Sequence, residues 1–250
     1  MRRRVGLRRL GFWYALAVVL LKPLATLSAR RRWRGAEHVP AQGGLILAAN
    51  HISHADPVFL AEFVVYGTGR IARFMAKSTL FEGGGLVPRV MRGADQIPVH
   101  RQTSDASLAL RDAVAALHAG ECIVIYPEGT VSRDPEKWPM VARTGVARLA
   151  LLSGAPVVPV AQWGAQDVMD TYRTGRVRVL PRSDVVISAA PAVDLSRWQG
   201  RELTGEVLRE ATAAVMDAIT TELEQVRGGV RPGEPMVWQG AHTTRRRRSA

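Results

Sequence analysis

A histidine and an aspartate five positions apart are the residues in this sequence whose types and spacing could do chemistry. His51 follows an apolar run, residues 45–49, that predicts a short buried strand. Asp56 comes just before residues 58–66, which predict a helix ended by Gly67. The histidine therefore lies just after the carboxyl end of a strand, and the aspartate lies where a helix begins.

The way the chain enters this helix decides whether the two side chains can meet. Asp56 is a favourable N-cap, and Pro57 favours the first helical position. Five positions apart on one continuous helix, the two side chains would point about 140° from each other. A loop between them removes that conflict, and Pro57 also biases Asp56 away from helical geometry. We therefore expect the carboxylate of Asp56 to bind one ring nitrogen of His51 and to leave the other nitrogen free.

A histidine held in this way can act as a general base. A neutral imidazole takes a proton from an alcohol, while the carboxylate fixes the tautomer and stabilises the imidazolium that forms. No activated serine is needed if the substrate itself carries the hydroxyl. The sequence thus favours catalysis by His51, oriented by Asp56.

Two other interpretations of the same residues stay open. The first is a loop histidine beside an aspartate that only caps a helix, because aspartate is common at N-caps. The second is a metal-dependent hydrolase with His51, His54 and Asp56 as ligands. The remaining histidines are scattered without paired spacing, and a mononuclear site usually gathers three or four ligands, so we expect no metal.

The net charge of +12 lies almost entirely in the two ends of the 250-residue chain. Residues 1–35 contribute +10 and residues 242–250 contribute +4, which leaves −2 on residues 36–241. A nucleic-acid-binding domain more often carries its charge on its folded face, so we expect no nucleic-acid partner. Basic ends around an apolar segment indicate an anionic membrane surface as the partner. The single cysteine, Cys122, excludes an internal disulfide and fits a reducing compartment.

Residues 1–35 are expected to form membrane-anchoring helices. Their unbroken apolar run, residues 10–21, is 12 residues long, whereas a bilayer span needs about 20. Lys22 and Pro23 interrupt any longer span. We expect a helical hairpin or a kinked helix that lies in one leaflet at the cytoplasmic face of the membrane, so that the protein is peripheral or monotopic. A cleaved signal peptide is the alternative, and the arginines that follow Ala29 argue against it.

Between residues 36 and 226, predicted strands alternate with predicted helices, an order that is typical of an α/β domain. The strands are expected at 45–49, 71–76, 122–126, 157–161, 177–180 and 185–189, and the helices at 58–66, 104–118, 141–152 and 203–226. Pro159 predicts that its strand lies at an edge of the sheet or contains a bulge. Residues 227–250 are rich in glycine and proline and then in arginine, and we expect them to be a disordered tail.

Three polar side chains follow predicted strands directly or end an extended segment. These are His51, Arg101 and Glu128. Ligands of α/β folds bind at the carboxyl ends of the strands, so we expect these three residues to face one site.

Four short blocks of sequence contain these residues. The blocks are Asn50-His51 with Asp56, Gly93 through Ile97-Pro98-Val99-His100-Arg101, Tyr126-Pro127-Glu128-Gly129-Thr130, and Val157-Val158-Pro159-Val160. In this order and at this spacing they resemble the glycerolipid acyltransferases of the 1-acyl-sn-glycerol-3-phosphate acyltransferase type. Arg143, just before a helix start at 144–150 that also fits, stands where this family usually has a basic residue. The resemblance covers about residues 36–190, together with the basic, apolar N-terminus.

The resemblance implies a fold like that of glycerol-3-phosphate acyltransferase, with a mixed, mostly parallel sheet flanked by helices. It implies an O-acyltransferase of phospholipid biosynthesis in which His51 is the general base and Asp56 its orienting partner. The hydroxyl of lysophosphatidic acid would attack the thioester of acyl-CoA or acyl-carrier protein directly and give phosphatidic acid. No covalent acyl-enzyme, no metal and no other cofactor would be required.

The resemblance also implies a set of substrate contacts. Arg101 would bind the phosphate of the acceptor, and an arginine fork pairs well with phosphate oxygens. Glu128, Gly129 and Thr130 would hold the acceptor, with Gly129 permitting a tight turn. Pro159 would shape the acyl or acceptor pocket.

The sequence departs from the family pattern at one position. The family usually has an arginine after the Gly-Thr of its third block, whereas this chain has Val131, and a positive charge returns only at Arg133. We take Arg133 as a further candidate substrate-binding residue. The departure leaves the acceptor open between lysophosphatidic acid and another lysophospholipid or alcohol.

Overall fold

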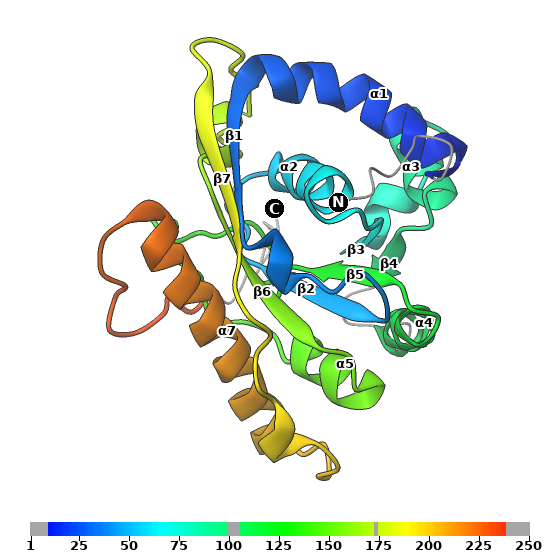
Figure 1. Cartoon of the computed structure of the whole chain (residues 1–250), viewed down its shortest axis with the longest axis vertical. Coiled ribbons are helices and arrows are strands. Elements are labelled where there is room, and N and C mark those ends of the chain that lie inside the picture. The colour runs from blue at the N-terminus through cyan, green and yellow to red at the C-terminus, as the bar shows by residue number, and fades with distance from the viewer. Residues whose placement is uncertain (1–9, 100–105, 173–174, 239–250) are drawn as a thin grey trace, which may run out of the picture.

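The described residues form one seven-stranded sheet with the strand order β1-β7-β6-β2-β5-β3-β4 (Figure 1). The computed structural model describes residues 10–99, 106–172 and 175–238, so Arg101 lies outside the described residues. All neighbouring strands are parallel except β6 and β7. The expected α/β fold with a mixed, mostly parallel sheet flanked by helices is confirmed.

The bounds of the elements follow the chain order. The strands are β1 Ala29–Arg34, β2 Leu45–Ala49, β3 Ala72–Lys77, β4 Ile97–Val99, β5 Cys122–Ile125, β6 Val157–Trp163 and β7 Ser183–Ala189. The α-helices are α1 Gly11–Ser28, α2 Asp56–Glu62, α3 Leu86–Gly93, α4 Ala106–His118, α5 Gly145–Ser153, α6 Ala165–Val168 and α7 Gly205–Arg227.

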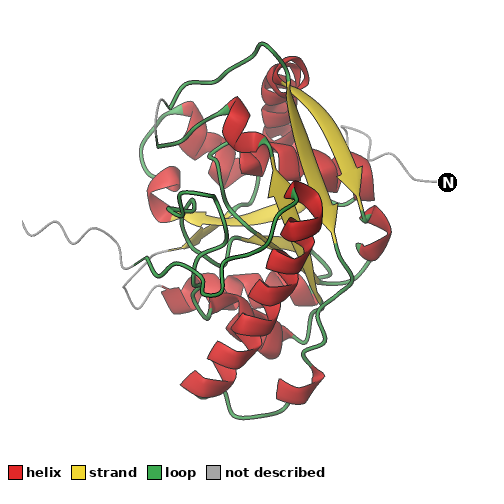
Figure 2. Ribbon diagram, turned by 90° about the vertical axis from the view of Figure 1, so that its left-hand side faces the viewer, coloured by secondary structure: helices red, strands yellow, loops and turns green. Residues whose placement is uncertain are grey.

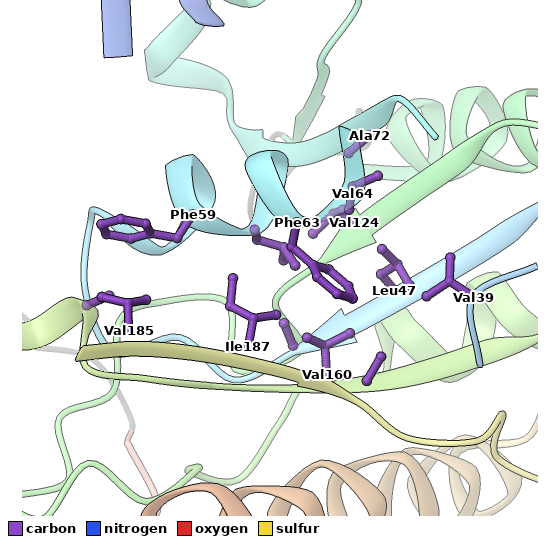
Figure 3. Close-up of a cluster of buried hydrophobic side chains, with 14 of the residues drawn as sticks. Val39, Leu47, Phe59, Phe63, Val64, Ala72, Val124, Val160, Val185 and Ile187 are labelled. Carbon is purple, nitrogen blue, oxygen red and sulfur yellow. The ribbon is translucent and has the colours of Figure 1, made fainter. Parts of the chain in front are cut away.

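The central strand β2 is buried on both faces, and its side chains divide between two cores. Leu45, Leu47 and Ala49 point into a core shared with α2 and the neighbouring strands, in which Leu47 is labelled (Figure 3). Ile46 and Ala48 point into a second core shared with α4, α5 and α7. Because side chains alternate along a strand and both faces are covered, this strand is apolar throughout. Figure 2, seen from the α7 side, shows the twisted sheet with helices on both faces.

The parallel strands in the middle of the sheet end at one edge. Ala48 of β2 pairs with Ile125 of β5, so the segments that begin at His51 and Tyr126 leave adjacent strands side by side. The next strand, β3, ends at Lys77 at the same edge. Carboxyl ends of parallel strands are where α/β folds place their ligands, and this edge carries the candidate site.

The helix after the His51 loop ends later than expected. It continues from α2 into a π-helical turn at Phe63–Thr68 and ends at Gly69, whereas Gly67 had been the predicted stop. Gly69 adopts a left-handed conformation with φ of 78°, and its N–H bonds the carbonyl of Val64. A glycine in this conformation is a common helix end, so the second glycine of the pair terminates the helix.

The arginine-rich segment that was expected to belong to the membrane anchor is the edge strand β1. It pairs in parallel with β7, and its side chains alternate, with Arg31 and Trp33 partly buried and Arg30, Arg32 and Arg34 exposed. The boundary expected after residue 35 therefore lies beyond the first strand of the sheet. Exposed charges on an edge strand oppose pairing with a second chain, which accounts for this composition.

The described part of the N-terminal segment forms one helix and not a hairpin. α1 is 18 residues long and keeps Pro23 inside it. By length and composition alone it is apolar enough to cross a membrane, a test that signal sequences also meet. Its inner side packs Leu10 and Tyr14 against Val65, and it spans the distance from β1 to α3 (Figure 1). Its outer side exposes large apolar side chains, namely Phe12, Val19, Leu20, Leu24 and Leu27.

Pro159 lies in a central strand, so the prediction of an edge position is wrong. β6 pairs with β2 on one side and with β7 on the other. The carbonyl of Pro159 accepts a hydrogen bond from Ala190, one residue beyond the end of β7. Since the N and C=O of one strand residue face the same side, the position of the missing N–H faces Ala190, beyond the last residue of β7, and not β2.

Two other predicted elements differ from the structure, and one helix of the structure was not predicted. Residues 177–180 do not form a strand, because only Val177 pairs, in an isolated bridge with Met169. The helix predicted at 141–152 begins later, at α5, since the N–H of Val141 bonds Met236 and that of Arg143 bonds Pro127. The helix α3 was not predicted.

Part of the segment expected to be a disordered tail lies against the folded domain. Residues 228–238 contain no helix or strand, but Arg231 bonds Asp217 and Glu224 on α7. Its backbone N–H also bonds the Glu224 carboxylate. Residues 239–250, with the C-terminal arginines, lie outside the described residues.

We predict that Arg31→Ala destabilises the protein by about 2 kcal/mol, because it leaves the carboxylate of Glu62 buried without its cation. Arg31 bonds both oxygens of Glu62, whose side chain is only 6% exposed. The matched control is Arg32→Ala on the same strand. Arg32 pairs with Asp184, and their side chains are 62% and 50% exposed, so the loss of this pair should change the free energy of unfolding by no more than about 0.5 kcal/mol. The measurement is the free energy of unfolding in urea. Equal losses in the two variants would contradict the prediction.

Candidate active site

His51 and Asp56 meet at the carboxyl end of β2. His51 is the second residue after the strand, and Asp56 is the first residue of α2. Nδ1 of the imidazole lies 2.9 Å from Oδ2 of the carboxylate. Asp56 is completely buried, whereas the side chain of His51 stays 14% exposed and lines a cavity. The contact expected from the sequence is confirmed.

Asp56 binds the loop that precedes the helix and does not cap the helix. The N-cap residue is Ala55, which makes no side-chain cap. Oδ2 of Asp56 accepts hydrogen bonds from the backbone N–H groups of Ile52 at 2.6 Å and Ser53 at 2.8 Å, in addition to the bond from the imidazole. The N-cap prediction is therefore wrong, because the carboxylate turns back to close the loop around the histidine.

This arrangement decides which nitrogen of His51 carries the hydrogen. An ionised carboxylate only accepts hydrogen bonds, so Nδ1 is the donor to Asp56. The lone pair then lies on Nε2, to which no described residue forms a hydrogen bond. A free lone pair at Nε2 is what a general base requires.

The ring of Tyr126 fixes the plane of the imidazole. The two rings stack with centroids 4.1 Å apart and an angle of 17° between their planes. Phe74 stacks in turn on Tyr126, with centroids 6.5 Å apart. Burial raises the pKa of Tyr126, and the nearby charge of Asp56 raises that pKa further, so the phenol stays neutral.

Glu128 binds the backbone of the loop that carries His51. Its two oxygens accept the N–H of His51 at 3.1 Å and the N–H of Met140 at 3.0 Å. The side chain is buried, and burial raises the pKa of Glu128 to about 8, while these two backbone N–H groups act in the opposite direction. Four residues further on, the N–H of Ser132 bonds the carbonyl of His51 at 2.7 Å. The segment after β5 thus holds both the N–H and the C=O of the histidine.

Asn50 and Gln162 join the end of β2 to the neighbouring strand β6. The Asn50 side chain donates to the carbonyl of Gln162 at 3.0 Å and accepts its N–H at 2.7 Å. The Gln162 side chain donates to the carbonyl of Asn50 at 3.0 Å. This pair was not predicted, since the sequence gives no sign that two residues 112 positions apart face each other. It fixes the point from which the His51 loop starts.

The cavity beside His51 has a volume of about 1010 Å³ and is mostly apolar. Its walls come from α1, α2, α3 and α4, from the ends of β3, β4 and β5, and from the start of α5. The apolar side chains that line it include Tyr14, Val18, Leu21, Val58, Val65, Phe74, Met91, Val99, Leu110 and Ile125. The N-terminal helix is therefore a wall of the cavity, which the sequence did not reveal.

Two of the predicted substrate-binding residues lie at this cavity. Gly129 and Thr130 both line it, and Gly129 has a positive φ of 72° in the turn that follows β5. Val131, the residue that departs from the family pattern, also lines the cavity and is otherwise buried. The loop thus presents a glycine, a hydroxyl and an apolar side chain to a bound molecule.

Three other predicted residues among those described, Glu128, Arg133 and Pro159, do not line the cavity. The guanidinium of Arg133 stacks on the ring of Tyr172 at 3.5 Å and lies 5.1 Å from the ring of Trp238. Pro159 is buried within β6. Arg101 lies outside the described residues, and its contact with phosphate stays a prediction.

The three residues of the metal interpretation do not gather into a donor cluster. In the described part of the chain, no group of three or more His, Cys, Asp or Glu side chains is placed to hold a metal ion. His54 lines the cavity, and burial, followed by the proximity of His51, lowers the pKa of its ring. Asp56 uses Oδ2 for three N–H donors, one of them from His51.

Comparisons with known proteins show which family the sequence resembles. The sequence model of the Acyltransferase family matches residues 30–163, more than half of the chain. A protein of Bacillus subtilis named 1-acyl-sn-glycerol-3-phosphate acyltransferase is 25% identical over 170 residues, which cover 67% of this chain and 79% of that protein. A protein of Borreliella burgdorferi with the same name is 22% identical over 201 residues, 77% of this chain and 71% of that protein.

The fold is also that of a solved structure. The crystal structure of the 1-acyl-sn-glycerophosphate (LPA) acyltransferase PlsC from Thermotoga maritima matches with a TM-score of 0.59 and 22% sequence identity. The match covers 85% of this chain and 82% of that chain.

We predict that Glu128→Gln removes a pH dependence of stability. Burial raises the pKa of Glu128 from 4.5 to about 8, so between these pH values the folded state keeps a proton that the unfolded state has lost. This contribution to stability is complete below pH 4.5 and is lost as the pH rises through about 8. The free energy of unfolding of the wild type, measured in urea, should therefore fall relative to that of the variant between the two pH values.

The control for this measurement is Glu82→Gln, at an exposed position. Its free energy of unfolding should run parallel to that of the wild type across the same pH range. A constant difference between wild type and Glu128→Gln would show that the carboxyl does not change its proton affinity on folding.

Proposed function

Because the chain belongs to the acyltransferase family, we propose that it transfers a fatty acyl group from an acyl thioester to the free hydroxyl of lysophosphatidic acid, giving phosphatidic acid. The donor in this proposal is acyl-CoA or acyl-carrier protein. The names of the bacterial relatives support the acceptor. The observation that carries the proposal is the His51–Asp56 pair, whose open Nε2 belongs to a side chain that lines a large apolar cavity.

In the proposed reaction, His51 is the general base. The acceptor hydroxyl gives its proton to Nε2 as its oxygen bonds the thioester carbonyl carbon. The imidazolium keeps its Nδ1–H on Oδ2 of Asp56, which lowers the energy of the charged ring. The carbon–sulfur bond then breaks, and the leaving sulfur takes the proton from Nε2. Proton and electron pairs balance without an acyl-enzyme.

The Gly129–Thr130 loop is placed to act on the reacting carbonyl. It lines the cavity beside His51, and since the N–H of Gly129 is bonded to the carbonyl of Tyr126 at 2.9 Å, the donors that the loop offers are the N–H and the hydroxyl of Thr130. Backbone N–H groups aimed at an oxygen that becomes negative stabilise the transition state more than the ground state. In the proposed reaction this loop faces the carbonyl oxygen, and the apolar walls take the hydrocarbon chains.

The same cavity connects the chemistry to a membrane surface. Tyr14 and Val18 of α1 line the cavity, while Val19, Leu20 and Leu27 on the same helix are exposed. We place these exposed side chains in one leaflet, at the cytoplasmic face, with the basic N-terminal residues near anionic headgroups. A lysolipid then reaches the cavity from the leaflet in which its own chain lies.

One observation favours a second acceptor. Val131 takes the place of the arginine that the family usually has, and it lines the cavity with an apolar side chain. The missing arginine would cost less binding energy for an acceptor with a larger headgroup, or for an alcohol without phosphate, than for lysophosphatidic acid. A panel of acceptors separates the two possibilities.

We predict that His51→Ala lowers the rate of thiol release from acyl-CoA in the presence of lysophosphatidic acid by about 10³-fold or more, because the base is lost. Purified wild type and variant are assayed with and without acceptor. The matched control is His118→Ala, an exposed histidine at the end of α4, which should keep wild-type turnover.

The result decides between functions. Wild-type turnover that requires the acceptor and His51 supports acyl transfer with a histidine base. Turnover of equal rate without any acceptor would mean thioester hydrolysis, and it would overturn the proposal.

Asp56→Asn tests the orienting carboxylate separately. We predict that kcat falls by about 10³-fold while KM changes little, since the neutral amide no longer stabilises the imidazolium or fixes its tautomer. The control is Asp112→Asn on the exposed side of α4, which should behave as wild type. If Asp56→Asn raised KM and left kcat unchanged, the carboxylate would be acting on substrate binding and not on the base.

A further inference from the structure

The charges on the cavity wall do not balance. Four cationic residues line the cavity, namely Lys22, Lys77, Arg143 and Arg148. Among the described lining residues the acid is Glu62, and its oxygens are bonded by Arg31 at 3.0 and 3.1 Å. An apolar cavity with unpaired cations at its wall is suited to an amphipathic ligand that carries a negative group.

Arg143 is the cation that the fold ties most directly to the catalytic loop. Its backbone N–H bonds the carbonyl of Pro127 at 3.0 Å. Its side chain lies over Gly129, where Cδ and Nε would be 3.4 Å from a Cβ on that glycine. Among the described residues, none forms an ion pair with Arg143 or with Arg148.

The order of the strands places the loop under Arg143 next to the loop that carries His51. His51 follows β2, and the loop under Arg143 follows β5, the adjacent strand. Adjacent strands lie about 5 Å apart. In a lysophospholipid, the free hydroxyl and the phosphorus on the next glycerol carbon are separated by only a few bonds, which span a similar length. With the hydroxyl at Nε2, the loop after β5 and the Arg143 side chain over it are therefore the neighbouring groups that can reach the phosphate.

A phosphorylated acceptor needs a donor other than Val131. This valine lines the cavity at the position where the family usually has an arginine, but it offers no donor. Arg143 lines the same cavity from the start of α5 and supplies a planar fork that matches phosphate oxygens in two parallel hydrogen bonds. Arg148, in the second turn of α5, lines the cavity as well.

We propose that Arg143, assisted by Arg148, binds the phosphate of the acceptor and makes that phosphate a requirement for efficient acylation. The proposal rests on the proposed function, because it takes the hydroxyl at His51 as its reference point. A phosphate could also come from the nucleotide of the acyl donor. We assign the acceptor as the source, because Arg143 is bonded to the loop after β5, the strand next to the one that leads to His51.

The kinetic test compares Arg143→Gln with the matched control Arg209→Gln, an exposed arginine on α7 outside the cavity lining. Each is assayed with lysophosphatidic acid and with monoacylglycerol, which is the same acceptor without phosphate. We expect Arg143→Gln to lower kcat/KM for lysophosphatidic acid about tenfold or more, since a hydrogen bond between charged groups is lost. It should leave kcat/KM for monoacylglycerol unchanged, Arg143→Lys should restore part of the loss, and Arg209→Gln should match wild type.

A second arm separates the acceptor from the donor. The same variants are assayed with an acyl-pantetheine donor, which carries the thioester without nucleotide phosphates. If the loss in Arg143→Gln persists with this donor, the acceptor phosphate is the ligand. If the loss disappears with acyl-pantetheine, or if both acceptors lose equally, the proposal is overturned.

A binding measurement keeps the outcome independent of turnover. Calorimetric titration with sn-glycerol 3-phosphate should show binding to the wild type and to Arg209→Gln, and binding at least about tenfold weaker to Arg143→Gln. Equal affinities would overturn the proposal. Binding that depends on Arg143 in a protein that releases no thiol with any acceptor would support the phosphate site while rejecting the proposed function.

Discussion

One buried oxygen, Oδ2 of Asp56, accepts three N–H groups, and the rest of the site depends on it. Two of these donors are backbone amides of Ile52 and Ser53, and the third is the imidazole of His51. A buried carboxylate is costly unless it is hydrogen-bonded, so the loop must take the path that supplies these donors. The same bonds leave Nε2 as the free nitrogen. Loop geometry and proton position are thus set by a single interaction, and a residue that seemed suited to cap a helix serves the histidine instead.

The loop is held a second time from the neighbouring strand. Glu128 accepts the N–H of His51 and that of Met140, while Ser132 bonds the carbonyl of His51. Each oxygen of the Glu128 side chain thus accepts a hydrogen bond from a backbone N–H of the protein. The third sequence block therefore has two roles. Glu128 positions the base and does not hold the acceptor as predicted, whereas Gly129 and Thr130 line the cavity. A parallel sheet makes this possible because it brings the ends of β2 and β5 to the same edge.

The N-terminal helix joins two requirements of a lipid-modifying enzyme. α1 lies across the open side of the site and contributes Tyr14, Val18 and Leu21 to the cavity, with Trp13 packed on Gly93 of α3. Its other side exposes large apolar side chains. The exposed face is suited to a membrane, and the inner face is suited to a hydrocarbon chain. Because β1 follows α1 directly and belongs to the sheet, the helix is fixed to the domain and its distance from His51 is set by the fold.

The sequence by itself determined the features that depend on neighbours along the chain. The apolar run of β2, the alternation of strands with helices, and the meeting of His51 with Asp56 across a short loop follow from local geometry and could be predicted. The tertiary structure alone decided the features that join distant segments. It made the arginine-rich residues of β1 an edge strand through pairing with β7, and it turned Glu128 toward Met140. It also set Arg143 over Gly129 at the cavity. Such contacts are fixed by the packing of the whole sheet and its helices, and no pattern of nearby residues encodes them.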